Sequence, residues 1–159
     1  MCRGGLRDLI MSITTKTGDK GYTSVASRRV KKDSKIIEAI GTIDELQAII
    51  EDVEIQKDLY EIMGEIAVGK ISNLEFKISK LEKEIENLEK KLKPLTKFLI
   101  FKKEKARKLN WVRTVVRRAE RRVVALENLE FKILNLKTII VYLNRLSDYF
   151  YLLSRQEEE

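Results

Sequence analysis

Histidine, cysteine and proline are absent or nearly absent from this 159-residue chain, which has no His, one Cys and one Pro. Without imidazole, the chain lacks the commonest general base and the usual zinc ligand. The lone Cys2 excludes an internal disulfide and a cysteine metal cluster. The longest run without a charged residue is seven residues, whereas a membrane-spanning helix needs about 20 apolar residues. We therefore expect a soluble protein without a membrane segment, whose chemistry does not use histidine.

Positive charge is concentrated in two segments. The chain has 32 Lys and Arg against 25 Asp and Glu, a formal net charge of +7. Residues 103–122 contribute +7 and residues 14–35 contribute +5, so the rest of the chain sums to −5. Such local clusters favour capture of an anion at a site over coating of nucleic acid. The 43% of hydrophobic residues suffices for a single core.

Apolar residues recur at three- and four-residue steps through most of the chain, which is the period of one helix face. No glycine follows Gly69 and only Pro94 breaks the remaining sequence. We expect helices at about 34–50, 54–69, 74–92, 103–126 and 129–155, with Trp111 on the buried side of the fourth. The predicted fold class is all-α: a five-helix antiparallel bundle of the ferritin-like, up-and-down type with an N-terminal nucleotide-binding loop.

The first polar cluster is the loop TTKTGDKG at residues 14–21, followed by Thr23 and Ser24. Glycines that turn backbone N–H groups outward, hydroxyl donors and lysines together suit a polyphosphate. The spacing is not that of a P-loop. A solvated polar loop explains the same composition.

The second polar cluster is a row of arginines at 113, 117 and 121, with Glu120 on the same side of the expected helix. Such a row repels itself unless anions or acids face it. Salt bridges to neighbouring helices, through Glu120 and Asp148, explain it as well as a ligand site does.

The third polar cluster, Asn144, Arg145 and Asp148, interrupts an otherwise apolar helix. Burying these groups costs free energy unless they are paired, so they should face the arginine row or a ligand. A hydrogen-bonded network in the core is the alternative.

Four strings together resemble the PduO-type ATP:cob(I)alamin adenosyltransferases: TKTGDKGYTS at 15–24, GTIDEL at 41–46, RTVVRRAER at 113–121 and YLNRLSDYFYLLSR at 142–155. The resemblance spans residues 12–155. It implies a homotrimer that binds ATP between adjacent subunits and transfers the 5′-deoxyadenosyl group of ATP to cob(I)alamin, releasing triphosphate. Because reduced cobalt is itself a strong nucleophile, this reaction needs no protein nucleophile or general base, which agrees with the missing histidine.

The resemblance also implies roles for individual residues. Among the catalytic residues, Arg117 contacts a phosphate, Glu120 contacts the ribose or the metal shell, and Phe98 crowds the lower face of the cobalt. Asp44 and Arg113 form an inter-subunit salt bridge. The ATP site comprises Thr15, Lys16, Thr17, Gly18, Thr23, Ser24, Lys31, Arg113, Arg117, Arg118, Glu120, Arg121 and Asn144.

The expected ligands are ATP, Mg²⁺ bridging its phosphates with no side chain assigned as direct metal ligand, and a cobalamin or related corrinoid. Expected partners are a reductase or an adenosylcobalamin-dependent enzyme, without nucleic acid or membrane, in the cytoplasm. Two segments depart from the family pattern. Residues 102–105 are charged where a Pro-Gly-rich loop is usual, and residues 26–29 form a short segment where the family commonly has a longer loop with a glycine. Phe101 is the alternative to Phe98.

Three further hypotheses remain open at this point. A bundle of this kind could hold ATP or a corrinoid without catalysis, as a sensor or delivery protein. A basic helical module would bind nucleic acid with steep salt dependence, but it gives no reason for the loop at 14–21. A structural coiled coil explains only the heptads at 74–92. We interpret residues 1–11 as an upstream extension, 12–155 as one helical-bundle domain and 156–159 as an acidic tail.

Overall fold

Five helices run up and down in the computed structural model, which describes residues 14, 16–69, 72–96, 98–127 and 133–159. They are α1 (Lys35–Ile49), α2 (Val53–Val68), α3 (Leu74–Lys91), α4 (Glu104–Val124) and α5 (Leu136–Glu158). The expected five-helix bundle is therefore confirmed. The upstream extension predicted at residues 1–11 lies outside the described residues.

Local side-chain chemistry sets the ends of α2 and α3. The Asp52 carboxylate accepts hydrogen bonds from the backbone N–H groups of Glu54 and Ile55, at 2.9 and 3.1 Å, and so caps α2. Gly69 ends that helix with a left-handed φ of +74°, a conformation that glycine adopts without strain. Asn73 caps α3 in the same way as Asp52 caps α2.

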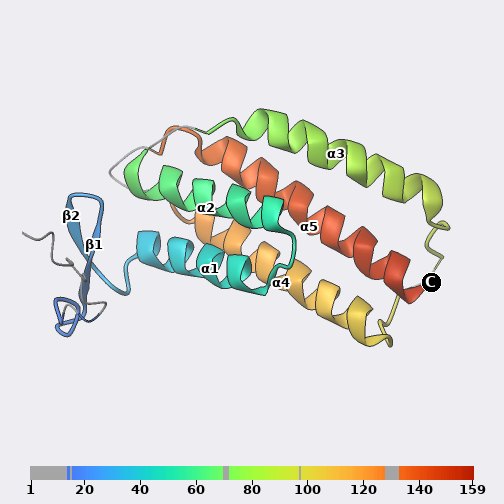
Figure 1. Ribbon diagram of the computed structural model, residues 1–159, viewed down its shortest axis with the longest axis horizontal. Helices are drawn as coiled ribbons and strands as arrows, with labels where there is room; N and C mark the ends of the chain where they lie inside the picture. The colour runs from blue at the N-terminus through green and yellow to red at the C-terminus, as the bar shows by residue number, and fades with distance from the viewer. Residues whose placement is uncertain (1–13, 15, 70–71, 97, 128–132) are drawn as a thin grey trace, which may run out of the picture.

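The core lies around α5, which runs between α3 and α4 (Figure 1). Its residues Tyr142, Leu143 and Leu146 are almost fully buried. Helix α1 packs against both α4 and α2. Burying a large apolar side chain stabilises a fold by about 1.5–3 kcal/mol, so this central stripe of α5 holds the bundle together.

Two details of the helices differ from the sequence-based expectation. Residues 133–135 form an irregular turn, so α5 begins at Leu136 rather than near 129, and it continues through Glu158. Trp111 is 53% exposed, so its expected place in the core was wrong. It precedes the buried Val112 by one residue, and that step rotates a side chain by about 100° around the helix, away from the core face.

A small antiparallel hairpin precedes the bundle, and the sequence did not lead us to expect strands. β1 (Tyr22–Val25) pairs with β2 (Arg28–Lys31), with Tyr22 opposite Lys31. Val25 is buried and anchors the hairpin to the core. Strands of four residues are too short for their alternation to stand out in a sequence. No helix in the described ranges is both long and apolar enough to cross a lipid bilayer.

Candidate functional site

Helix α4 carries the predicted row of arginines. Arg113, Arg117 and Arg121 lie at four-residue steps and so share one side of the helix. Arg121 Nη1 donates a hydrogen bond to the backbone oxygen of Arg117 at 3.1 Å. The exposed guanidinium of Arg117 has no ion-pair or hydrogen-bond partner among the residues that the structure describes. Arg117 therefore remains available to an external anion.

The neighbouring Arg118 and Arg122 are paired with α1. Arg118 Nη2 lies 2.5 Å from Glu45 Oε1, and Arg122 Nη2 lies 3.0 Å from Glu38 Oε1. Residues two positions apart on a helix point in nearly opposite directions, so Arg118 and Glu120 are not brought together. The basic helix α4 thus forms salt bridges to a neighbouring helix as considered, but their acids are Glu45 and Glu38 of α1 instead of Glu120 and Asp148.

Asn144 on α5 joins two charged side chains beside the arginine row. Its Nδ2 donates to Glu120 Oε1 at 3.2 Å, and its Oδ1 accepts from Arg145 Nη1 at 3.0 Å. Arg145 Nε in turn donates to Glu82 Oε1 on α3 at 2.8 Å. Because the two amide atoms of Asn144 have different partners, the network favours one orientation of the amide. A hydrogen-bonded chain therefore runs from α3 through α5 to Glu120 on α4, while Asp148 is exposed.

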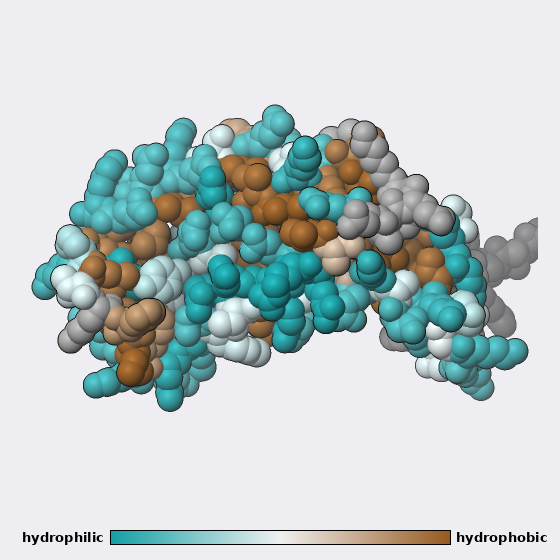
Figure 2. Space-filling view, turned by 180° about the vertical axis from the view of Figure 1, so that it is seen from behind, coloured by the Kyte–Doolittle hydropathy of each residue, from teal (hydrophilic) through white to brown (hydrophobic). Residues whose placement is uncertain are grey.

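A groove of ≈ 1050 Å³ opens where the segment between α3 and α4 meets α4 and α5. Residues 95–96 and 98–101 of this segment line it. Phe98 is fully exposed and Ile100 is 77% exposed. In Figure 2 an apolar patch reaches the surface at this end of the molecule. Ligand pockets commonly measure about 300–1,000 Å³, so the groove has room for a large ligand with an apolar face.

Arg113 lines the groove from α4. Its Cζ atom lies 5.8 Å from the ring centre of Tyr151, and its Nε donates to Asn110 Oδ1 at 2.8 Å. The stacked ring and the amide hold the guanidinium at the groove wall. Asp44, the residue expected to pair with Arg113 in another subunit, is exposed on α1.

The N-terminal loop folds back on the second strand of the hairpin. Arg29 Nη2 donates to the backbone oxygen of Thr17 at 2.5 Å. The side chain of Lys32 lies beside Gly18, where an added Cβ would come within 3.0 Å of Lys32 Nζ. Gly21 takes a φ of +78°, and its N–H donates to the backbone oxygen of Gly18 at 3.1 Å. The loop is therefore a tight turn lined by basic side chains.

The other predicted loop residues are distributed over the hairpin. Ser24 and Lys31 lie on one face, whereas Thr23 lies on the other, because successive strand residues alternate. Lys16, Ser24 and Lys31 are exposed. Thr15 lies outside the described residues.

The N-terminal loop and the groove lie at opposite ends of the bundle. The hairpin stands at the start of α1, while the segment between α3 and α4 lies beside the end of α5 (Figure 1). Helix α1 alone has 15 residues, which separates the two ends by about 20 Å. One chain by itself therefore does not bring its loop to Phe98 and Arg113.

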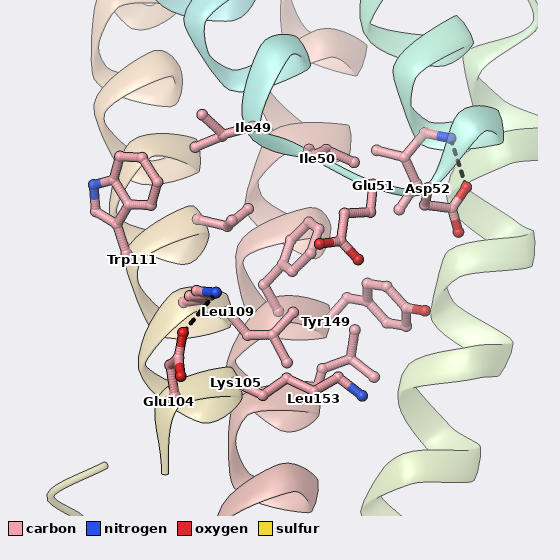
Figure 3. A pocket seen from close by; sticks show the side chains of 14 residues that line it. Ile49, Ile50, Glu51, Asp52, Glu104, Lys105, Leu109, Trp111, Tyr149 and Leu153 are labelled. Carbon is pink, nitrogen blue, oxygen red and sulfur yellow. Dashed lines mark hydrogen bonds and ion pairs between the residues drawn. The ribbon is translucent and has the colours of Figure 1, made fainter. Parts of the chain in front are cut away.

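A second cavity, of ≈ 630 Å³, lies between the end of α1, the start of α4 and the end of α5 (Figure 3). Its walls are mostly apolar and include Leu109 and Phe150, but none of the predicted site residues. Several of its polar groups are already engaged. Lys105 pairs with Glu157, Lys108 pairs with Glu104, and Asp52 caps α2. We assign no ligand to it.

Sequence reasoning did not identify Tyr151 or Glu82 as parts of the site. Tyr151 lies seven residues after Asn144, which is two helical turns on the same face, so its spacing offered a signal. Glu82 lies on α3, and nothing in its local sequence indicates that it pairs with Arg145.

Comparison with known proteins gives a consistent result. A sequence model of the family described as cobalamin adenosyltransferase matches residues 13–157. The corrinoid adenosyltransferase of Bacillus subtilis is 38% identical to this chain, over 91% of this chain and 86% of that protein. The human corrinoid adenosyltransferase MMAB is 36% identical, over 92% of this chain and 68% of that protein.

Solved structures of a PduO-type ATP:corrinoid adenosyltransferase from Lactobacillus reuteri have the same fold. An arginine-to-lysine variant in complex with ATP superposes with a TM-score of 0.74 at 27% identity, covering 92% of this chain and 94% of that one. A phenylalanine-to-histidine variant in complex with cobalamin and ATP superposes with a TM-score of 0.72 at 26% identity, covering 92% and 90%.

Proposed function

This chain belongs to the cobalamin adenosyltransferase family, and on that premise we propose that it transfers the 5′-deoxyadenosyl group of ATP to cob(I)alamin. The products are adenosylcobalamin and triphosphate. One observation carries the proposal: α4 presents Arg117, whose guanidinium is unpaired among the described residues, the Glu120–Asn144 pair and, toward its start, Arg113 at the wall of an apolar groove. A nucleotide site and a site for a large apolar ligand therefore lie along one helix.

The reaction is a displacement at the ribose C5′. The electron pair of Co(I) forms the cobalt–carbon bond, and the C5′–O bond breaks with its electrons leaving on the triphosphate oxygen. No proton needs to be removed from the nucleophile, so the absence of histidine is no obstacle. The chain has to orient C5′ and stabilise the charge that develops on the triphosphate. Arg117 supplies that charge, and Glu120, held by Asn144, accepts hydrogen bonds from the ribose.

The groove receives the corrin ring. Phe98 projects fully exposed from the segment that lines the groove, so an incoming apolar macrocycle can pack against it without displacing other side chains. An aromatic ring at this place excludes an axial ligand from the lower face of the cobalt. Arg113 and Tyr151 also line the groove.

We propose that Mg²⁺ enters with ATP. No group of three or more acidic, His or Cys side chains in the described ranges forms a metal site, and Mg²⁺ commonly binds through substrate phosphates and one or two carboxylates. No side chain is assigned as a direct ligand of the ion, and Glu120, whose Oε1 accepts a hydrogen bond from Asn144, keeps the ribose as its partner. When bound, the ion neutralises charge on the triphosphate.

We propose a homotrimer with ATP between adjacent subunits. Loop residues such as Lys16 and Lys31 lie about one α1 length away from the groove of their own chain, so a second chain must supply the loop to a complete site. Asp44, exposed on α1, is free of packing constraints and pairs with Arg113 of a neighbouring subunit. Sedimentation velocity tests this assembly: a trimer is expected, and a stable monomer with full activity would contradict it.

The surroundings of the enzyme follow from its substrates. Cobalt must arrive as Co(I), so a reductase supplies the electron, and an adenosylcobalamin-dependent enzyme receives the product. We propose that the reaction takes place in the cytoplasm, where ATP is available.

Product analysis tests the proposed function. Purified protein, ATP, Mg²⁺ and chemically reduced cob(I)alamin are incubated without oxygen and separated by liquid chromatography. Adenosylcobalamin and triphosphate should form in equal amounts. ATP binding without adenosylcobalamin would instead indicate a sensor or delivery protein.

A further inference from the structure

The last turn of α5 contacts the start of α4. Glu158 Oε2 accepts hydrogen bonds from the backbone N–H groups of Lys102 and Lys103, at 2.8 and 3.0 Å. Lys103 is the N-cap residue of α4, and a lysine side chain has no oxygen that could accept hydrogen bonds there. The Glu158 carboxylate takes that place, and its charge is favoured at this end of the helix dipole. Glu157 adds a 2.7 Å salt bridge to Lys105 Nζ.

The same end of α5 also contacts the beginning of the segment that joins α3 to α4. Arg155, only 8% exposed, donates from Nη2 to the backbone oxygen of Lys93 at 2.5 Å. Tyr151, one turn earlier, packs edge-on against Phe101, with ring centres 6.3 Å apart and an interplanar angle of 85°. Positions 151, 155 and 158 share one helix face. One face of α5 therefore holds the segment at its beginning and at its end (Figure 1).

Between these two contacts, the described residues of the segment have no regular secondary structure to hold them in place. Residues 93–96 and 98–102 form no helix or strand. Phe98 is fully exposed, so its ring gains no packing energy from the part of the chain that the structure describes. Its position over the groove is therefore set by the flanking backbone that α5 holds.

We propose that Glu158 and Arg155 are positioning residues for the corrinoid. They hold the backbone at Lys93 and at Lys102 and Lys103, on either side of Phe98, and thereby the Phe98 side chain, against the groove. The inference rests on the proposed function, because it assigns the groove to the corrin ring. The bonds from the Lys103 and Lys102 backbone also hold the pKa of the Glu158 carboxyl below its usual value, so the carboxylate is charged at neutral pH.

Glu158→Ala tests the inference, with Gln156→Ala as the matched control from the same turn, where the side chain is exposed. Binding of cob(II)alamin to the ATP-loaded protein is followed by EPR, which needs no turnover, and ATP binding is measured by calorimetry. The Kd for cob(II)alamin should rise about fivefold in Glu158→Ala, because two charge-assisted hydrogen bonds are lost. It should stay unchanged in Gln156→Ala, and ATP affinity should be unchanged in both.

Two further measurements separate positioning from general stability. Glu158→Gln keeps a carbonyl oxygen that can accept the backbone hydrogen bonds, so it should restore most of the cob(II)alamin affinity. Hydrogen exchange at the Lys102 and Lys103 amides should be faster in Glu158→Ala than in the control.

The outcomes distinguish the two hypotheses. Equal cob(II)alamin affinities in Glu158→Ala and the control, with normal binding by the wild type, overturn this inference and leave the proposed function intact. An equal loss of ATP and corrinoid affinity also overturns it, because that result indicates general destabilisation. If the wild type binds ATP but no corrinoid, the proposed function fails and this inference fails with it.

Discussion

At the scale of single residues, partners distinguish side chains that look alike in the sequence. Five arginines lie within ten positions of α4, yet Arg118 and Arg122 are paired with acids of α1, whereas Arg117 has no partner in the described part of the chain. An unpaired exposed cation next to Glu120 is the one best placed to meet a triphosphate.

Replacing Arg117 with Ala should lower kcat/KM by about a hundredfold, as expected when one donor to a developing negative charge is removed. The helical circular dichroism should not change, because the side chain contributes nothing to the core. Arg122→Ala is the matched control, since it removes an equal charge from the same helix. Comparable losses in both variants would assign the effect to net charge and not to a site.

Glu82→Gln should raise KM for ATP by about two- to fivefold, because a partly exposed ion pair with Arg145 is weakened. The amide of Asn144 then loses its fixed orientation and Glu120 loses a preset position. Steady-state kinetics of this variant are compared with those of Glu86→Gln, an exposed residue of the same helix. If KM for ATP is the same in the two variants, the series of hydrogen bonds that starts at Glu82 on α3 does not orient the site.

At the scale of elements, glycines within helices offer a matched pair of tests. Gly41 in α1 and Gly64 in α2 both have open space where a Cβ would lie. An alanine in place of a helical glycine stabilises a fold by about 0.5–1 kcal/mol.

Gly64→Ala should raise the Tm by about 1–4 °C, measured by differential scanning calorimetry. Gly41→Ala should bring a similar gain in helix stability, but it should weaken the trimer, because Gly41 lies one turn from Asp44 on the outer face of α1. Sedimentation at several concentrations measures that loss. An unchanged trimer in Gly41→Ala would exclude this face of α1 from the interface.

The helices were predictable from the sequence because each buries one face at a regular spacing. The start of α5 was not, since Ile133 is buried in a turn and so continues the apolar pattern without being helical. The hairpin was missed because its strands are four residues long. In the site, Arg117, Glu120 and Asn144 came from motifs, whereas the pairing of Glu82 with α5 depends on tertiary packing alone.

At the scale of the whole molecule, a polar cluster between α2, α3 and α5 links stability to pH. Lys77 lies 2.8 Å from Asp58 and 2.6 Å from Glu61. Burial by itself lowers the pKa of Lys77, but the hydrogen bonds to Asp58 and Glu61 outweigh burial and raise it. Burial, followed by the negative charge of Glu84, raises the pKa of Tyr149 to about 12.

Both groups therefore stabilise the fold most at neutral pH. A group whose pKa is raised by folding contributes its full stabilisation at pH values below its pKa in the unfolded chain. That contribution declines as the pH rises through its pKa in the folded protein. The pKa of Tyr149 in the unfolded chain is 10.0, so the free energy of unfolding should fall above about pH 10. Urea titrations at pH 8 and pH 11 measure this fall, and Tyr149→Phe should make it smaller. A fall of the same size in the variant would show that Tyr149 does not cause the loss of stability at high pH.

The conversion of cob(I)alamin to adenosylcobalamin by this molecule can be followed directly by absorbance. Chemically reduced cob(I)alamin, ATP and Mg²⁺ are mixed with the protein without oxygen, and the absorbance is followed as cob(I)alamin is consumed. We predict conversion to the adenosylcobalamin spectrum that requires both protein and ATP. An unchanged cob(I)alamin spectrum, from protein that binds ATP, would contradict the proposed transferase activity.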